Sequence, residues 1–304
     1  MARIALVGAI GILLLKTGAW LVTGSVALAS DAAESIVNVV AAVTLLVALR
    51  ISRTPPDLEH RYGHEKIEDL SSAFEAGLIL LASLLIAGTA VDRLFTPVPL
   101  DQPLVGLVLA GASALVNALL ALWLARTARA TDSTALRANA KHLATDVLTS
   151  VGVLAGVAGT WLTGFERLDP LIALLVALQI ARTGVTLLRR SISRLLDERL
   201  PEQEEDAIDE ILSSHPDVLG YHRLYTRRSG RTRFVEVDVF VDPVWTVQRA
   251  HDLVVELEDA MAAKLGTLRS TVHVEPFVPG RREGTTPPVE EYPPESGKRV
   301  NREA

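Results

Sequence analysis

The chain has 304 residues, of which 49% are hydrophobic and 5% aromatic, with a formal net charge of −6. The absence of cysteine excludes disulfides and thiolate metal ligands, and the negative charge gives no reason to expect nucleic acid as a partner. Apolar residues concentrate before residue 190 and charged residues after it, which predicts a membrane part followed by a soluble part.

Several apolar stretches are long enough to cross a bilayer, which takes about 20 helical residues. They lie at residues 4–25, 28–50, 70–91, 103–125, 143–163 and 168–188. The first lacks a signal-peptide cleavage pattern, so we expect a retained helix. Lysine and arginine gather after the second, fourth and sixth stretches. The positive-inside rule therefore predicts that both termini are cytoplasmic.

The second stretch carries polar residues near its start. Asp31, Glu34 and Asn38 follow the spacing i, i+3, i+7, which places them on one face of a helix. One interpretation is that Asp31 caps the helix and Glu34 closes a capping box. Capping does not account for Asn38, which lies deeper. Ionisable and polar residues at bilayer depth are costly and typically mark an ion path.

The fifth stretch carries a second polar pair, His142 and Asp146, at i, i+4 on one helix face. Alternatively, His142 reaches the cytoplasmic interface and Asp146 pairs with Lys141 or Arg137. Two helices that each offer two donors would supply four ligands, enough for a tetrahedral divalent metal. Lys16, an isolated charge in the first stretch, is a weaker signal, better explained by an interhelical hydrogen bond or by extension to the interface.

The connection after the second stretch, "PPDLEHRYGHEKIEDL", carries Asp57, His60 and His64 with the spacing D-x2-H-x3-H. One short loop with this spacing can wrap a metal ion with a carboxylate and two imidazoles. A solvated loop would also be polar, but two of only seven histidines lie here. We therefore predict a metal site in this loop.

After residue 201 the pattern predicts helix, strand, strand, helix and strand. Ser229-Gly230 is typical of a hairpin turn, and the residues around 247–265 form an amphipathic pattern. This order indicates a small two-layer α+β domain. We expect a transmembrane domain at 1–190, a linker at 191–201, a cytoplasmic metal-binding domain at 202–279 and a disordered tail at 280–304. The candidate metal ligands of the cytoplasmic domain are His222, Asp238, His251, His273 and Glu275.

The stretches "LVTGSVALASDAAESIVN", "HRYGHEKIEDLS", "ANAKHLATDVLTS" and "LLDERLP" together resemble the cation diffusion facilitator family. The resemblance covers residues 4 to about 278. It implies a homodimeric, proton-coupled antiporter that exports divalent metal, with six spans in the inner membrane and a ferredoxin-like cytoplasmic domain.

By this resemblance, the transport site consists of Glu34, Asn38, His142 and Asp146. The commoner family pattern has Asp or His in place of Glu34 and Asp in place of Asn38, so this sequence departs at both. By donor type this set could suit Zn, Fe(II), Mn or Co. Zinc is the metal we expect first, and Asp31 is a possible substitute ligand. The departures also leave open a transporter of a different cation.

The resemblance also assigns the loop cluster and the cytoplasmic cluster. Asp57, His60 and His64 match a second metal site of the family. The cytoplasmic domain is implied to hold a binuclear site that stabilises the dimer and regulates transport. Its ligands would be His222, Asp238, His251, His273 and Glu275. Lys66 and Asp197 match a charge pair that holds the dimer at the membrane surface.

The hypothesis from sequence is alternating access, in which protons compete with metal at His142, a residue type with an ordinary pKa of about 6.5. One alternative is a membrane-bound metalloenzyme, but the sequence holds no H-E-x-x-H motif. Another is a membrane-anchored sensor, although an anchor needs no polar residues inside the bilayer.

Overall fold

The computed structural model describes residues 2–131 and 134–277, without the side chains of 2–7, 128, 131, 134–139 and 141–142. The chain divides into two compact units, Met1–Ser193 and Arg194–Ala304. The tail expected at 280–304 lies outside the described residues.

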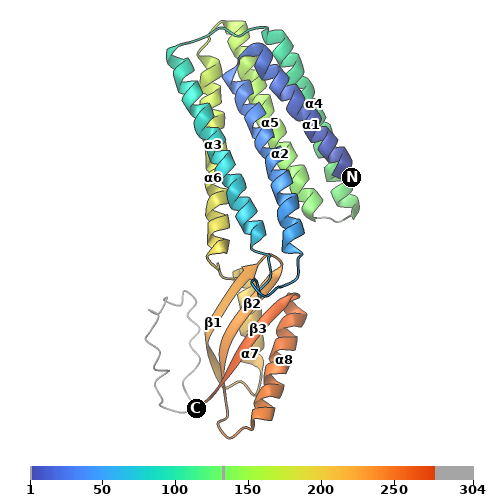
Figure 1. Ribbon diagram of the computed structural model, residues 1–304, viewed down its shortest axis with the longest axis vertical. Helices are drawn as coiled ribbons and strands as arrows, with labels where there is room; N and C mark the ends of the chain where they lie inside the picture. Colours follow the sequence, from blue (N-terminus) through green and yellow to red (C-terminus); the bar gives the residue numbers. More distant parts are fainter. Residues whose placement is uncertain (1, 132–133, 278–304) are drawn as a thin grey trace. The chain divides into compact units, whose positions relative to one another are not determined.

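The first unit is a bundle of long helices that run side by side (Figure 1). Their bounds are α1 Ala2–Thr23, α2 Val26–Ser52, α3 Ile67–Phe95, α4 Pro103–Thr131, α5 Thr134–Thr163 and α6 Leu168–Leu195. Within the described residues, five are long and apolar enough to cross a membrane, and α1 adds a shorter apolar segment, Gly8–Thr23. The predicted helical transmembrane architecture is confirmed.

The start of α2 corrects one reading of the sequence. Gly24 has a φ of +64°, a conformation that ends α1, and the Ser25 side chain then accepts a hydrogen bond from the Leu28 backbone N–H. Ser25 is thus the N-cap, and Asp31 lies more than a turn inside the helix. The capping interpretation of Asp31 is wrong, because the helix begins two residues earlier than the apolar run suggested.

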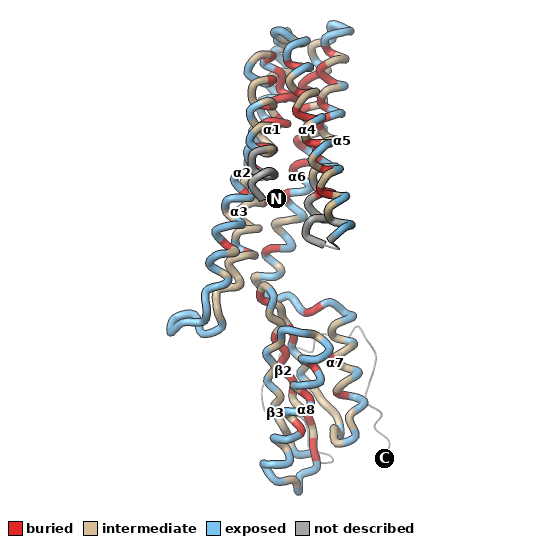
Figure 2. The backbone as a smooth tube through the Cα atoms, turned by 90° about the vertical axis from the view of Figure 1, so that its right-hand side faces the viewer, coloured by how far each residue is buried: buried red, intermediate tan, exposed pale blue. Residues whose placement is uncertain are grey.

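Buried apolar side chains from all the helices of this unit gather toward one end of the bundle. This packed end holds the connections 24–25, 96–102 and 164–167, and Figure 2 shows the buried residues of the unit mainly in this half. The cluster comprises Ala19, Val26, Ala27, Leu28, Ile86, Ala90, Ala110, Val153, Val157, Ala173, Ala177 and Ile180. Six of these are alanines, small enough to let the helices approach closely.

Polar contacts also join the connections at the packed end. The Ser25 hydroxyl and the Val26 backbone N–H both donate to the Asp169 carboxylate, the latter at 2.8 Å. The Asp101 N–H donates to the Thr23 carbonyl at 3.0 Å. The carboxylate at the N-terminus of α2 satisfies donors that a helix start would otherwise leave unpaired. The packed end is therefore closed by both apolar and polar contacts.

The second unit is a small α+β domain, which confirms the predicted order of elements. It contains α7 Glu202–Ser214, β1 Gly220–Ser229, β2 Thr232–Val241, α8 Val247–Leu265 and β3 Leu268–Pro276. The sheet order is β1-β2-β3, with β1 antiparallel and β3 parallel to β2. The segment 191–201, expected as a linker, is helical at its start because α6 continues to Leu195.

The alternation of β2 separates the two faces of this sheet. Val235, Val237, Val239 and Val241 are buried in one core with the apolar residues of α7 and α8. The residues between them, among them Asp238, lie on the other face. The helices thus cover one face and leave the other to polar and aromatic side chains.

Candidate metal-binding sites

Helices α2 and α5 bring acidic and amide side chains together inside the bundle. Asn38 Nδ2 donates to Asp146 Oδ2 at 3.4 Å, and Asp146 is only 6% exposed. Glu34 Oε2 is buried and has no hydrogen-bond partner among the described residues. The side chain of His142 lies outside the described residues, although its backbone is part of α5. The structure therefore joins Asn38 and Asp146 and leaves a buried carboxylate oxygen on Glu34 unsatisfied.

Such an arrangement suits a divalent cation. A carboxylate removed from water needs a compensating positive charge or hydrogen bonds. Glu34 and Asp146 together would neutralise a doubly charged ion, and the amide oxygen of Asn38 is a further neutral donor. The contact between Asn38 and Asp146 also places the polar faces of α2 and α5 at the same level of the bundle.

Asp31, the possible substitute ligand, already has other partners. Lys16 Nζ lies 2.8 Å from its Oδ1, and both side chains are almost fully buried. The Ser150 hydroxyl lies 2.9 Å from Oδ1 and 3.2 Å from Oδ2. The interhelical hydrogen bond predicted for Lys16 is thus present. Sequence reasoning did not join Lys16 to Asp31, since the two residues lie on different helices.

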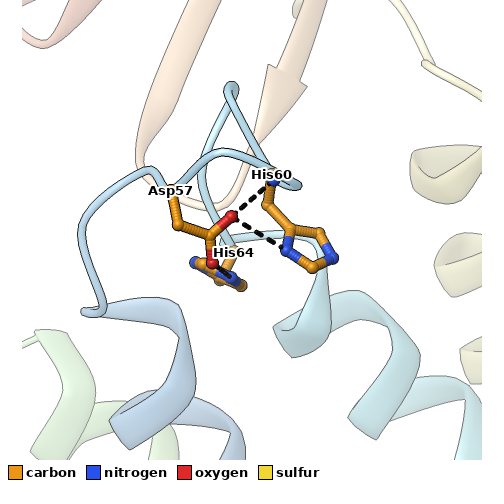
Figure 3. A group of neighbouring side chains, drawn as sticks. All are labelled: Asp57, His60 and His64. Atoms are coloured by element: carbon orange, nitrogen blue, oxygen red, sulfur yellow. Dashed lines mark hydrogen bonds and ion pairs between the residues drawn. The ribbon is translucent and has the colours of Figure 1, made fainter.

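The loop between α2 and α3 gathers its three predicted ligands (Figure 3). Asp57, His60 and His64 each offer a ligand atom, and these atoms lie within 4.8 Å of one another. Asp57 Oδ1 lies 3.2 Å from His60 Nδ1, and Oδ2 lies 3.3 Å from His64 Nε2. The backbone N–H of His60 donates to Asp57 at 2.6 Å. The loop therefore holds two imidazoles and a carboxylate in one small group.

The acidity of Asp57 fits this role. The backbone N–H of His60 is the main cause that holds the pKa of Asp57 below its usual range. The carboxylate therefore stays ionised throughout the pH range in which histidines titrate. The pH dependence of metal binding at the loop should then come from the imidazoles alone.

We accordingly expect zinc affinity at the loop to fall by roughly 100-fold per pH unit at pH values acidic enough to protonate both imidazoles, because both must lose protons to bind. His60→Ala should reduce this slope to about tenfold per unit, since one imidazole remains. Zinc titrations of the full chain at several pH values, with Asp146→Asn and His222→Ala removing the other candidate sites, measure the slope. A slope that His60→Ala leaves unchanged would contradict the assignment.

The second unit holds another cluster on the sheet face away from the helices. His222, Asp238 and Glu275 offer ligand atoms within 4.8 Å of one another. His222 Nε2 lies 3.5 Å from Asp238 Oδ2 and 3.6 Å from Glu275 Oε2. His222 Nε2 and Asp238 Oδ2 are both buried without a hydrogen bond among the described residues. A buried imidazole nitrogen that faces two carboxylates and makes no hydrogen bond among the described residues is typical of a cation ligand.

A β-bulge places His222 in this cluster. His222 pairs with Asp238, and Tyr225 pairs with Glu236, so two residues of β1 oppose one of β2. Arg223 lies in this bulge with a φ of +54°, a conformation that is costly for a residue with a side chain. Without the bulge, residues three apart would point to opposite faces. The sequence carries no clear signal for this irregularity.

The remaining predicted cytoplasmic ligands lie less close. His273 Nε2 is 3.7 Å from Glu275 Oε1 and is mostly exposed. His251 is exposed on α8 and does not belong to the three-residue group. Arg223 Nη1 lies 3.3 Å from Asp238 Oδ2, a cation beside the ligand that the sequence did not suggest. The structure therefore joins three of the five predicted ligands directly and His273 through Glu275.

The predicted charge pair divides between the two units. Lys66 precedes α3 in the first unit and makes no capping hydrogen bond through its side chain. Asp197 belongs to the second unit, where it lies 3.6 Å from Arg227 Nη1. The pairing of Lys66 with Asp197 stays a prediction.

Comparison with known proteins covers both units. The model of the cation efflux transmembrane domain matches residues 2–196, and that of the cation efflux protein cytoplasmic domain matches residues 200–277. The uncharacterized transporter sll1263 of Synechocystis is 45% identical over 264 residues, covering 86% of this chain and 85% of that protein. The cation-efflux pump FieF of Serratia proteamaculans is 33% identical over 275 residues, covering 90% and 91%. The metal-bound C-terminal domain of the CzcD transporter from Thermotoga maritima is 35% identical and covers 24% of this chain and 87% of that one, with a TM-score of 0.24.

Proposed function

This chain belongs to the cation diffusion facilitator family of metal-efflux transporters, and from that premise we propose that it exports a divalent metal cation by proton antiport. The family consists of transporters, so the chain is a multi-pass membrane protein that moves cations and not an enzyme.

The observation that carries the proposal is the convergence of Glu34, Asn38 and Asp146 within the bundle. Two carboxylates and an amide from α2 and α5 would hold the cation, and His142 would complete the set from α5. A divalent ion cancels the charge of the two carboxylates, which makes its burial between helices tolerable. The unpaired oxygen of Glu34 supports this assignment, because it lacks a partner that a cation would supply.

The route of the ion follows from the packing. The apolar cluster and the Asp169 contacts close one end of the bundle. Positive residues gather in the connections at the opposite end, which by the positive-inside rule faces the cytoplasm. We infer that metal enters from the cytoplasmic end and that release requires the packed end to part. Protons would then replace the metal on the emptied ligands, which lowers the net charge that the site carries in the return step.

We propose zinc as the first candidate metal, with Fe(II), Mn and Co as alternatives. Carboxylate and amide oxygens with one imidazole form a harder set than several imidazoles would, which leaves room for Mn and Fe(II). The CzcD domain that resembles the second unit is described as metal-bound, and this supports metal binding by His222, Asp238 and Glu275 here. We further propose that the chain acts as a homodimer in the inner membrane and that metal in this unit tightens the dimer and thereby regulates transport.

Proteoliposomes loaded with a metal-sensitive dye and a pH-sensitive dye test the proposal. With purified protein and more zinc outside than inside, we expect zinc to enter the vesicles while protons leave. A more acidic interior should raise the rate of zinc entry, and a more alkaline interior should lower it. The same assay with Fe(II), Mn and Co ranks the substrates. Metal movement without proton movement would refute antiport. Metal binding without movement would favour the sensor alternative.

A further inference from the structure

We propose that Lys16 is a built-in counter-ion that engages Asp31 and keeps this third buried acid out of the transport site. The inference rests on the proposed function, because it concerns how many negative charges the site offers to the metal. It assigns Lys16 and Asp31 a positioning role and not that of ligands.

The cluster of Lys16, Asp31 and Ser150 joins α1, α2 and α5. Lys16 and Asp31 form an ion pair at 2.8 Å with side chains 3% and 1% exposed. The Ser150 hydroxyl donates to both oxygens of Asp31 and is itself 1% exposed. Each oxygen of Asp31 thus has a donor. A buried pair with a further hydrogen bond of this kind is the arrangement in which two charges can leave water together.

This cluster lies one helical turn from the proposed transport site on both helices. Asp31 precedes Glu34 by three residues on α2, and Ser150 follows Asp146 by four residues on α5. Asn38 Nδ2 lies 3.4 Å from Asp146 Oδ2, and Ser150 Oγ lies 2.9 Å from Asp31 Oδ1, so the same faces of α2 and α5 meet at both clusters. The two clusters therefore share one electrostatic environment, in which any free charge of one is felt by the other.

The charges of the region show why the pair matters. Asp31 and Glu34 on α2 and Asp146 on α5 are three neighbouring acids, but a divalent cation neutralises only two negative charges. The ammonium of Lys16 cancels Asp31, so that Glu34 and Asp146 remain for the metal. Without Lys16, Asp31 would add a third uncompensated negative charge to the region. Without Asp31, the ammonium would be an unpaired buried cation on a long, flexible stem beside two acids.

The loss of Asp31 with Lys16 retained gives a specific expectation, which the variant Asp31→Asn tests. The freed ammonium of Lys16 should turn to Glu34 and Asp146 and occupy the place of the metal. It would then act as an internal competitor, which raises the apparent KM for the metal more than it lowers the maximal rate. Loss of a merely structural contact would instead lower the amount of folded protein or the maximal rate. Loss of a ligand would not be corrected by any change at Lys16.

The experiment measures zinc uptake by proteoliposomes over a range of zinc concentrations for wild type, Asp31→Asn and the double variant Lys16→Met/Asp31→Asn. We expect Asp31→Asn to raise the apparent KM at least about tenfold through electrostatic competition. The double variant removes both charges and should return KM to within about threefold of wild type, because a buried ion pair can often be replaced by neutral residues. Size-exclusion chromatography of each variant in detergent gives the folded amount by which rates are normalised.

The outcomes separate this inference from the proposed function. If wild type moves no zinc, the proposed function fails. If wild type moves zinc and Asp31→Asn has an unchanged KM, or the double variant keeps the defect, the counter-ion role is overturned. Should Asp31→Asn not fold, the double variant alone decides through its KM. A double variant that also fails to fold would overturn the proposal, because the pair would then be required for the fold.

Discussion

Asp146→Asn should reduce zinc transport at least about 100-fold, because it leaves one carboxylate to neutralise a doubly charged ion inside the bundle. Asparagine has nearly the same shape, and its oxygen can still accept from Asn38 Nδ2, which lies 3.4 Å from Asp146 Oδ2 in the native chain. The fold should therefore survive while the charge is lost. Initial rates of zinc uptake in proteoliposomes, at equal amounts of folded protein, measure the effect.

Asp92→Asn is the matched control for this variant. Asp92 belongs to α3 of the same unit, but its side chain is exposed near the packed end, so its loss should leave the rate within about twofold. A rate for Asp146→Asn equal to that of the control would remove Asp146 from the transport site. A loss of zinc binding and transport together is the expected result, since the metal would have lost half of its compensating charge.

The helices of the membrane unit could be predicted from the sequence because long apolar runs have few alternatives. A segment without water must satisfy its backbone internally, and a helix does so within one segment. Their ends were less predictable. Ser25 begins α2 before the apolar run that hydropathy detects, and α6 continues to Leu195 through residues expected to form a linker. These ends depend on capping and on packing, which composition does not report.

The metal sites, like the helices, were predictable in part. Spacing along one element placed Asp57, His60 and His64 together, and it placed Glu34 and Asn38 on one face of α2. Contacts between elements were harder to foresee. The charged partner of Asp31 lies on α1, and no periodicity within α2 points to it.

The cytoplasmic cluster shows a second kind of limit. The alternating valines of β2 lie in the core, and Asp238, between two of them, lies on the other face of the sheet. The position of His222 depends on a bulge at Arg223 that shifts the register of β1 by one residue. Such an irregularity depends on tertiary contacts and not on the alternation of residue types. The sequence therefore supplied the five candidate ligands but not which three of them, His222, Asp238 and Glu275, come together.

His222→Ala should lower the zinc affinity of the second unit at least about 100-fold, because it removes the only imidazole of the group formed with Asp238 and Glu275 among the described residues. His222 Nε2 is buried without a hydrogen bond, so the truncation breaks none there and should spare the fold. Calorimetric zinc titration of the full chain, in a background of Asp146→Asn and His60→Ala, isolates this cluster from the other candidate sites.

His215→Ala is the control that gives this result its meaning. His215 belongs to the same unit, but its imidazole lies 3.4 Å from Glu256 Oε2 and is not part of the group. Equal losses in the two variants would show that zinc binds histidines of this unit without selection. A loss confined to His222→Ala places the ion on the sheet face away from the helices. The zinc-dependent tightening of the proposed homodimer should then be absent from the His222→Ala variant.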